Sequence, residues 1–359
     1  MSDTRPKRDT GPLDFGLNRP PFGIREAIGR VCDRLDLSAD EMADIVGEIM
    51  EDKATPAQIG GLLTGLRLKG ETVGEVVGAA RAMRARMTVV QANEAVLVDT
   101  CGTGGDGSGS VNVSTLAAIV VAACGVKVAK HGNRALSSKS GSHDVIEALG
   151  VDPAPNPELA LRCLNEVGLA FLFAPHYHAA TKAVAGPRRE LGIRTVFNML
   201  GPLTNPAGAR FAVNGIFAKD RCELLARAHQ ALGTERAMVV HGHGGYDEIV
   251  PSGPTFVAEL REGTVRTYEV TPTDFGLPTS DPIGLKGGDP QLNARILTEA
   301  LNAAPGPVRN VALMTASAAL YVAGQVPDLA AGAARAAAAI DDGRALGILQ
   351  SLRALAPVR

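Results

Sequence analysis

The chain has 359 residues, of which 45% are apolar and 21% are charged, and its formal net charge is −2. These values are typical of an ordinary globular protein that is long enough for two domains or one large α/β unit. A charge this close to zero excludes a general electrostatic attraction to nucleic acid or to an anionic membrane, although it leaves room for a local basic pocket.

The sequence offers no pattern for membrane insertion or secretion. The longest apolar run, residues 116–126, is about half the length that a membrane-spanning helix needs. The N-terminal residues are charged, but no hydrophobic segment follows them. The five cysteines are scattered and form no CxxC pair, so they indicate neither disulfides nor a zinc site. We therefore expect a cytoplasmic protein.

The first part of the chain reads as a tail followed by helices. Residues 1–20 are polar, contain proline and glycine, and are expected to form a flexible tail. From residue 21 to about residue 91 the pattern is helical throughout and contains no strand. Helix-start signals recur at Ser38 with Glu41, at Thr55 before Pro56, and at Thr72 with Glu75. About four helices are predicted here, and such a helical unit often doubles as an oligomer contact.

From residue 96 onward, strand patterns alternate with helix patterns. Strands are predicted at 96–100, 126–129, 170–173, 211–217 and 237–241, with a hairpin over 251–270 that turns at Glu262-Gly263. Alternation of this kind favours a largely parallel sheet covered by helices on both faces. The predicted fold class is therefore α/β: a small all-helical domain plus a larger domain whose mostly parallel central sheet is flanked by helices.

A glycine-rich loop follows the first predicted strand. The segment GTGGD, Gly102 to Asp106, leads on to Asn112, Ser114 and Thr115 at the start of an apolar helix. Glycine N–H groups and a helix N-terminus both suit a bulky anion. A hairpin or linker would also be glycine-rich. However, the next strand opens into a second polar loop, KHGNR at 130–134, and successive strand ends in a parallel sheet converge on one crevice.

An acidic pair forms a second candidate site. Asp247 and Glu248 come just after the last predicted parallel strand and a glycine-rich turn. Two carboxylates at a strand end, opposite a phosphate loop, suit Mg²⁺, which prefers hard oxygen ligands and substrate phosphates. Taken in isolation, a solvated acidic turn explains the pair equally well.

Several motifs in order carry a family resemblance. They are GTGGD, NVST at 112–115, KHGNR, SSKSGSHDVIEALG at 137–150, RRELGIRTVFNMLGPLTNPAG at 188–208 and HGHGGYDEI at 241–249. Together they resemble the signature of the anthranilate phosphoribosyltransferase family, from about residue 21 to the C-terminus. The resemblance implies Mg²⁺-dependent transfer of phosphoribose from 5-phosphoribosyl 1-diphosphate to the amino group of anthranilate, with release of pyrophosphate, in tryptophan biosynthesis.

The resemblance also implies how the chain is divided and assembled. The helical domain comprises residues 21–91 together with about 178–207, to which the chain returns. Residues 92–177 and 208–359 form the α/β domain that binds phosphoribosyl diphosphate. Two magnesium ions per subunit and a homodimer built through the helical domain are implied. No nucleic-acid or membrane partner is expected.

Site residues are carried over from the motifs position by position. The implied donor-binding residues are Gly102, Gly105, Asp106, Ser110, Asn112, Val113, Ser114, Thr115, Lys130, His131, Gly132, Asn133, Arg134, Ala135, Leu136, Ser137, Ser138 and Ser142. The implied anthranilate-binding residues are Gly102, His131, Asn133, His178, Arg188 and Pro202. The implied metal ligands are Ser114, Asp247 and Glu248.

The implied reaction asks little of the protein in covalent terms. Breaking the C1–O bond develops oxocarbenium character and charge on pyrophosphate, which placement and metal charge stabilise. An aromatic amine is already a nucleophile at pH 7, so no strong base is needed. Its carboxylate does need a cation, and Arg188 suits this role because a guanidinium binds a carboxylate through two parallel bonds.

Some positions have plainer interpretations or depart from the family. His131 is as well explained as a brace for its loop, and His241 and His243 are expected to be structural. HAATK at 178–182 and Gly186-Pro187 differ from the usual HPAMK and Pro-Val, and the shifted proline stands directly before Arg188. His143 and Tyr246 replace a usual small residue and a common leucine.

Two other functions remain open at this point. A nucleoside phosphorylase of the same fold shares the glycine loop and the neighbouring lysine, but it uses inorganic phosphate and does not need the acidic pair. A catalytically silent relative that binds nucleic acid in the same cleft is expected to have a basic surface and to lack the metal ligands. The sequence pI near 6.4 and the retained Asp247 and Glu248 argue against the latter.

Overall fold

The structure is a computed structural model that describes residues 22–134 and 140–358. The predicted tail at 1–20 and the donor-site candidates Ala135, Leu136, Ser137 and Ser138 lie outside the described residues. Within the described part, no helix is both long and apolar enough to span a bilayer.

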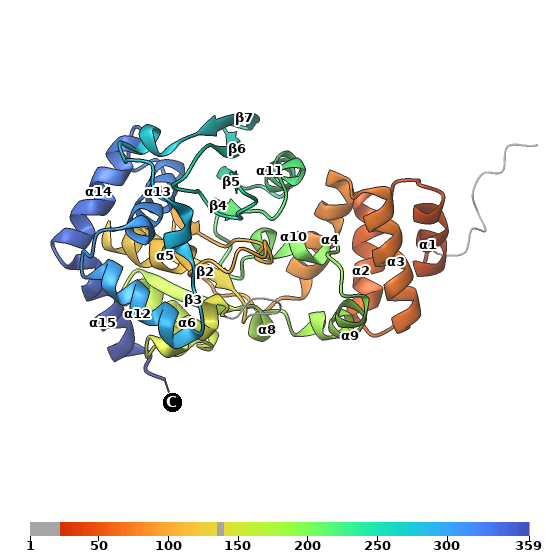
Figure 1. The fold of residues 1–359 in the computed structure, drawn as a ribbon. Helices are drawn as coiled ribbons and strands as arrows, with labels where there is room; N and C mark the ends of the chain where they lie inside the picture. The colour runs from red at the N-terminus through yellow and green to blue at the C-terminus, as the bar shows by residue number, and fades with distance from the viewer. Residues whose placement is uncertain (1–21, 135–139, 359) are drawn as a thin grey trace, which may run out of the picture.

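Four helices form the small helical unit at one end of the molecule (Figure 1). They are α1 (Ile24–Cys32), α2 (Ala39–Met50), α3 (Pro56–Lys69) and α4 (Val73–Arg86). Ser38, Thr55 and Thr72 each cap a helix reciprocally with the residue three positions later, which satisfies backbone N–H groups that a helix start leaves free. The predicted helix starts are therefore confirmed, and Thr55 forms a full capping box with Gln58.

The larger part contains one seven-stranded sheet in the order β3-β2-β1-β4-β5-β6-β7. The strands are β1 (Leu97–Asp99), β2 (Lys127–Gly132), β3 (Leu169–Phe173), β4 (Phe211–Gly215), β5 (Arg236–Gly242), β6 (Thr255–Arg261) and β7 (Thr264–Val270). The first five in chain order pair in parallel, and β6 and β7 add an antiparallel hairpin at one edge. The predicted mostly parallel sheet is confirmed.

Helices cover both faces of this sheet. The remaining α-helices are α5 (Val113–Ala123), α6 (Ser142–Ala148), α7 (Pro157–Glu166), α8 (Ala174–Tyr177), α9 (Lys182–Leu191), α10 (Phe197–Leu200), α11 (Cys222–Ala231), α12 (Pro290–Leu301), α13 (Pro307–Val322), α14 (Leu329–Asp341) and α15 (Arg344–Leu355). Short 3-10 turns occur at η1 (Ala179–Thr181), η2 (Gly201–Leu203), η3 (Lys219–Arg221), η4 (Pro272–Phe275) and η5 (Pro282–Leu285).

The side chains of β5 point alternately into the two main hydrophobic cores of the protein. Met238 and Val240 lie in the core that contains α5 and α13, whereas Val239 between them lies in the core that contains α11. This second core also contains α1 to α4 and the residues Val184, Val196, Phe197, Met199, Leu200 and Leu203. The excursion after β3 therefore packs against the helical unit, and α11 connects that unit to the sheet.

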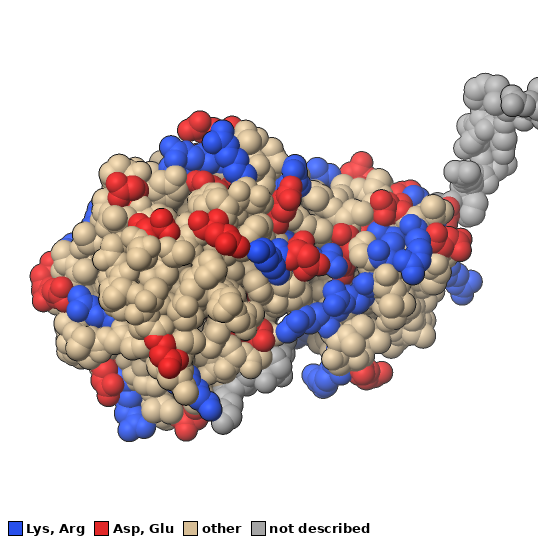
Figure 2. All heavy atoms as spheres, turned by 45° about the horizontal axis from the view of Figure 1, so that its top comes forward, with Lys and Arg blue, Asp and Glu red and all other residues tan. Residues whose placement is uncertain are grey.

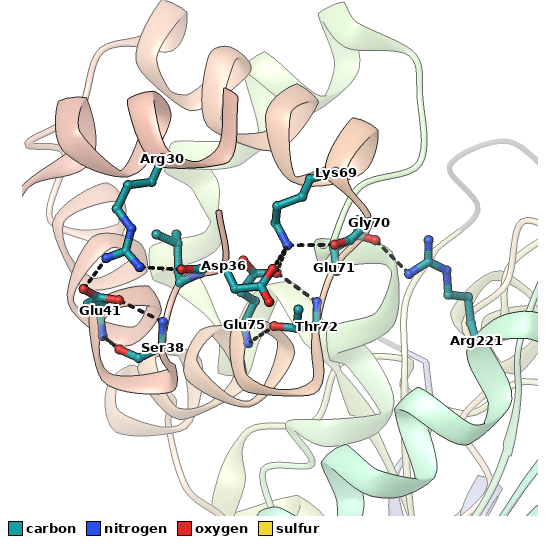
Figure 3. Close-up of polar contacts among 11 residues, drawn as sticks. Arg30, Asp36, Ser38, Glu41, Lys69, Gly70, Glu71, Thr72, Glu75 and Arg221 are labelled. Carbon is teal, nitrogen blue, oxygen red and sulfur yellow. Dashed lines mark hydrogen bonds and ion pairs between the residues drawn. The ribbon is translucent and has the colours of Figure 1, made fainter. Parts of the chain in front are cut away.

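A buried ion pair reinforces the same junction (Figure 3). Arg221, at the start of α11, lies 3.0 Å from Glu71, and their side chains are only 14% and 2% exposed. On the bundle side, Lys69 pairs with Glu75 at 3.1 Å and with Asp36 at 2.7 Å. Polar contacts as well as the apolar core therefore tie α11 to α3 and α4.

Candidate active site

The strands β1, β2 and β5 have their carboxyl ends on the same side of the sheet, and the glycine loop follows β1 on that side. Gly104 and Gly105 have φ values of 66° and 75°, a left-handed conformation that a side chain would strain. The loop is fixed to the end of β4, because Thr103 N donates to Gly215 O at 2.8 Å and Phe217 N donates to Thr103 Oγ1 at 3.2 Å.

The acidic pair lies directly against this loop. Asp247 N donates to Asp106 Oδ2 at 3.2 Å, and the nearby Gly104 backbone acts to lower the pKa of Asp247. A methyl group on Gly102 would lie 3.6 Å from Asp247 Oδ2, and one on Gly215 only 1.5 Å from Asp247 O. Only glycine at position 215 therefore allows the Asp247 backbone to approach β4 so closely.

The second carboxylate reaches the start of α5. The backbone of Ser114 acts to lower the pKa of Glu248, which places that carboxylate near the first turn of α5. Burial, reinforced by the negative charge of Asp106, raises the pKa of Asp247. Burial and the charge of Asp247 raise the pKa of Glu248. Three carboxylates are thus crowded into a site where a cation would relieve their repulsion.

Oxygen ligands of this kind fit magnesium. Among residues 22–134 and 140–358, no three His, Cys, Asp or Glu side chains form a metal-binding group. Asp247 and Glu248 supply hard oxygens and Ser114 a hydroxyl, and Mg²⁺ commonly takes its further ligands from water and substrate phosphates. The residues present therefore fit a metal that is held jointly by protein and substrate.

The other donor candidates before α5 are held by segments from later in the chain. Ser110 forms an isolated β-bridge with Lys286, just beyond η5. Asn112 does not cap α5; its Nδ2 donates to Ser140 O at 3.3 Å, and its Oδ1 accepts from the buried Asn293 at 3.0 Å. Val113 and Thr115 are buried in the first turn of α5. Asn112 thus connects the glycine loop to the chain beyond β2.

Lys130 and His131 were predicted to open the second loop, but they lie within β2, which continues to Gly132 because these residues pair with β3. Lys130 is a buried cation in this strand. Lys130 is 2% exposed, and its Nζ donates to Thr100 O at 3.1 Å. Its charge lowers the pKa of Asp99 and Glu248, against the larger effect of burial. The positive charge of Lys130 therefore partly compensates the negative charges of these two carboxylates.

The remaining described residues of this loop contact one another. A methyl group on Gly132 would lie 2.4 Å from Ser142 Oγ, and Ser142 Oγ donates to Asn133 O at 3.2 Å. Asn133 is exposed. The Arg134 guanidinium is paired with Asp144 and Glu147 of α6, each at 2.9 Å, so its charge is neutralised within the protein.

Two of the predicted anthranilate-binding residues are buried histidines that lie close together. His131 Nδ1–H donates to Gly201 O at 2.9 Å, and His178 Nε2–H donates to Thr204 O at 3.0 Å, with ring centroids 5.1 Å apart. Burial lowers the pKa of His131 to about 3 and that of His178 to about 4. The other ring nitrogen of each is buried without a partner in the described structure, and so is left as an acceptor. Through these hydrogen bonds both histidines also stabilise the backbone around η2.

The other acceptor candidates lie around the same turn. Pro202 is buried in η2, directly after Gly201. Arg188, in α9, is half-buried, with its guanidinium 5.6 Å from the Phe197 ring centroid. No carboxylate pairs with Arg188 in the part of the chain that the structure describes. Pro187 sits within α9 and has no N–H to donate, but the helix continues through Arg188 to Leu191.

Sequence analysis missed a group of buried polar residues that support the loops. Asn214 Nδ2 donates to Cys101 O at 2.7 Å, while its Oδ1 accepts from His229 Nε2 at 2.8 Å. Asn205 similarly donates to Asp99 Oδ2 at 2.7 Å. An asparagine within the apolar strand FAVNG was the available signal, but its partners are distant in sequence. Cys101 is also buried, and burial raises the pKa of its thiol, as expected of an unreactive cysteine.

Comparison with known proteins places these residues in a family. Residues 94–346 match the model of the glycosyl transferase family a/b domain, and residues 25–87 match that of its helical bundle domain. An anthranilate phosphoribosyltransferase from Rhodopseudomonas palustris is 52% identical over 332 residues, 92% of this chain and 98% of that protein. One from Thioalkalivibrio sulfidiphilus is 50% identical, over 92% of this chain and 97% of its own length.

Comparison with solved structures supports the same family. The chain resembles anthranilate phosphoribosyltransferase from Thermus thermophilus with a TM-score of 0.87 and 41% identity, over 92% of this chain and 98% of that one. The Saccharomyces cerevisiae enzyme in complex with PRPP and Mg matches with a TM-score of 0.84 and 28% identity, over 92% and 97% of the two chains. The chain therefore belongs to the anthranilate phosphoribosyltransferase family.

Proposed function

We propose that this protein transfers phosphoribose from 5-phosphoribosyl 1-diphosphate to the amino group of anthranilate, giving N-(5-phosphoribosyl)anthranilate and pyrophosphate. The observation that carries the proposal is the contact of Asp247 with the loop from Gly102 to Asp106, with Glu248 next to it and near the start of α5. Relatives about 50% identical bear that enzyme's name, and a structure of the yeast enzyme contains 4-fluoroanthranilate.

The diphosphate of the donor is proposed to lie between the glycine loop and the N-terminus of α5. Backbone N–H groups of the loop and the partial positive charge at the N-terminus of α5 favour an anion there. Lys130 adds a fixed positive charge behind the site. Gly132, Asn133 and Ser142 would hold the other end of the donor, as the family resemblance implies.

Magnesium would be held by Asp247, Glu248 and Ser114, and when bound it neutralises charge that develops on the diphosphate. Binding of magnesium by the yeast enzyme supports its use, and two ions per subunit remain our proposal. The pKa of both carboxylates is raised in part by repulsion from neighbouring carboxylates, and a bound cation would relieve this repulsion.

Arg188 is proposed to bind the carboxylate of anthranilate. It is half-buried and has no carboxylate partner among the described residues, which leaves its fork of N–H groups available. The free ring nitrogens of His131 and His178 are acceptors suited to an amine N–H. Because the amine is already nucleophilic, holding it in line with C1 supplies most of the rate.

Assembly and location are also proposals. Leu35 and Leu68 are 54% and 73% exposed on the helical unit, which supports a homodimer built through it. The five unpaired cysteines agree with a reducing, cytoplasmic location. We retain the division into 21–91 with about 178–207 and 92–177 with 208–359, which the shared core of α1 to α4 and the excursion supports.

Turnover of both substrates tests the proposal. Anthranilate fluorescence should disappear only when the donor diphosphate and Mg²⁺ are both present. The combined variant Asp247→Asn, Glu248→Gln should reduce the rate by at least about 100-fold. Absence of turnover by the intact protein, or phosphate-dependent release of base from thymidine or uridine instead, would overturn the assignment.

A further inference from the structure

The segment after α9 reaches across to the glycine loop through one arginine. Arg194 lies three residues beyond the end of α9, and its Nη2 donates to Gly105 O, 89 residues earlier in the chain. The same guanidinium lies 4.6 Å from the centroid of the Phe217 ring. No carboxylate pairs with Arg194 in residues 22–134 and 140–358. The Arg194 guanidinium therefore contacts a carbonyl oxygen of the donor loop and an aromatic ring beside that loop.

These two contacts act on the same loop. Phe217 N donates to Thr103 Oγ1, so the ring under Arg194 is fixed to residue 103 while its guanidinium holds residue 105. The peptide plane is rigid, so fixing Gly105 O also fixes the direction of the Asp106 N–H. Asp106 in turn accepts from Asp247 N. Arg194 thus orients the loop on the side that faces the acidic pair.

Arg194 also connects two parts of the site that are far apart in sequence. It follows α9, which carries Arg188, by a short turn in which Gly192 has a φ of 61°. A contact from this segment to Gly105 links the acceptor-side helix to the donor loop. Binding at one would then favour binding at the other, and such coupling is reciprocal.

We propose that Arg194 is a positioning residue that holds the donor loop in its binding conformation and couples it to α9. The inference rests on the proposed function, because it takes the loop to bind the diphosphate. It assigns Arg194 no contact with the reacting atoms. A guanidinium is needed, because lysine has neither the planar face that stacks on Phe217 nor the forked donors.

The test compares Arg194→Met, Arg194→Lys and Phe217→Leu with the surface control Arg227→Met. Steady-state kinetics give KM for the donor and kcat, and calorimetry with magnesium pyrophosphate gives a binding constant independent of turnover. Arg194→Met should raise both the donor KM and the pyrophosphate Kd by about tenfold, since one hydrogen bond from a charged group is lost. At saturating donor, kcat should change by less than about threefold, and Arg194→Lys should restore only part of the affinity.

The double variant Arg194→Met, Phe217→Leu separates positioning from general loosening. If the two residues act as one clamp, it should bind pyrophosphate no more than about twice as weakly as Arg194→Met alone. An unchanged donor KM and pyrophosphate Kd in Arg194→Met, or fully additive losses in the double variant, would overturn the inference. An inactive wild-type protein would instead refute the proposed function, so the two failures are distinguishable.

Discussion

Asp247 shows how the fold holds a single carboxyl group in an environment that disfavours its charge. The residue is 8% exposed and lies beside Asp106 and Glu248, and burial and the charge of Asp106 raise the pKa of its carboxyl. A raised carboxyl pKa means that the folded state binds the proton more tightly than the unfolded state does. The contribution of Asp247 to stability is therefore present at low pH and lost as pH rises toward its folded pKa.

Asp247→Asn should consequently stabilise the metal-free protein at pH 8, by at least about 1 kcal/mol in the free energy of unfolding. The gain should shrink toward pH 5, where the wild-type carboxyl is largely protonated. Urea denaturation in a chelator at the two pH values measures this, with the exposed Asp44→Asn as control. Added Mg²⁺ should stabilise the wild type but not the variant. A variant less stable than the wild type at pH 8 would contradict this account of the site.

Arg188 allows a second test at the residue scale. Arg188→Lys should raise KM for anthranilate by about tenfold and Arg188→Met by more, because a bidentate pair becomes a single contact and then none. The donor KM should stay within about threefold of its wild-type value. Steady-state kinetics with each substrate varied in turn decide the matter. A shift in donor KM alone would show that Arg188 serves the other substrate.

The strand ends show how elements position these residues. β4 was predicted to run to Phe217 but ends at Gly215, where the Asp247 backbone packs against it. Gly215→Ala should destabilise the protein by at least about 2 kcal/mol and displace Asp247, because the added carbon would overlap a backbone oxygen. Gly347→Ala in α15 is the control: its new carbon meets nothing within 4 Å, and it should stabilise by up to about 1 kcal/mol. Thermal unfolding and turnover should be measured for both variants. Equal effects of the two substitutions would contradict the close approach of the Asp247 backbone to Gly215.

Local signals predicted most of the elements. The caps at Ser38 and Thr72, the five parallel strands and the hairpin turn at Glu262-Gly263 were all visible in the sequence, and both turn residues have positive φ. The phosphate loop and the acidic pair were equally visible as motifs. The contacts of Arg194 with Gly105 and of His229 with Asn214 were not, because each depends on how distant segments pack.

At the scale of the whole molecule, α11 joins the helical unit to the sheet through the core and through Glu71 and Arg221 (Figure 3). Glu71→Gln should cost about 2 kcal/mol or more, because it leaves a mostly buried arginine with only the exposed Asp220, 3.5 Å away, as counter-charge. Glu223→Gln breaks a pair with Arg227 that is 51% exposed on both sides, and should cost less than about 1 kcal/mol. Calorimetric unfolding compares them. Equal losses would show that the pair does not join the two parts.

The charge on the face shown in Figure 2 is consistent with small acidic substrates rather than a polymer. Figure 2 shows basic and acidic side chains interspersed, with basic ones gathered near the waist between the two parts of the molecule. The net charge of −2 gives no overall attraction to a polyanion. Attraction of the donor therefore rests on the local site.

The most direct test of the central claim is a crystal structure with the donor diphosphate and Mn²⁺ in place of Mg²⁺, with the metal located by its anomalous scattering. We expect the metal against Asp247 and Glu248, with the diphosphate bridging it to the loop from Gly102 to Asp106. A donor bound away from that loop, or a metal site that excludes both carboxylates, would contradict the account.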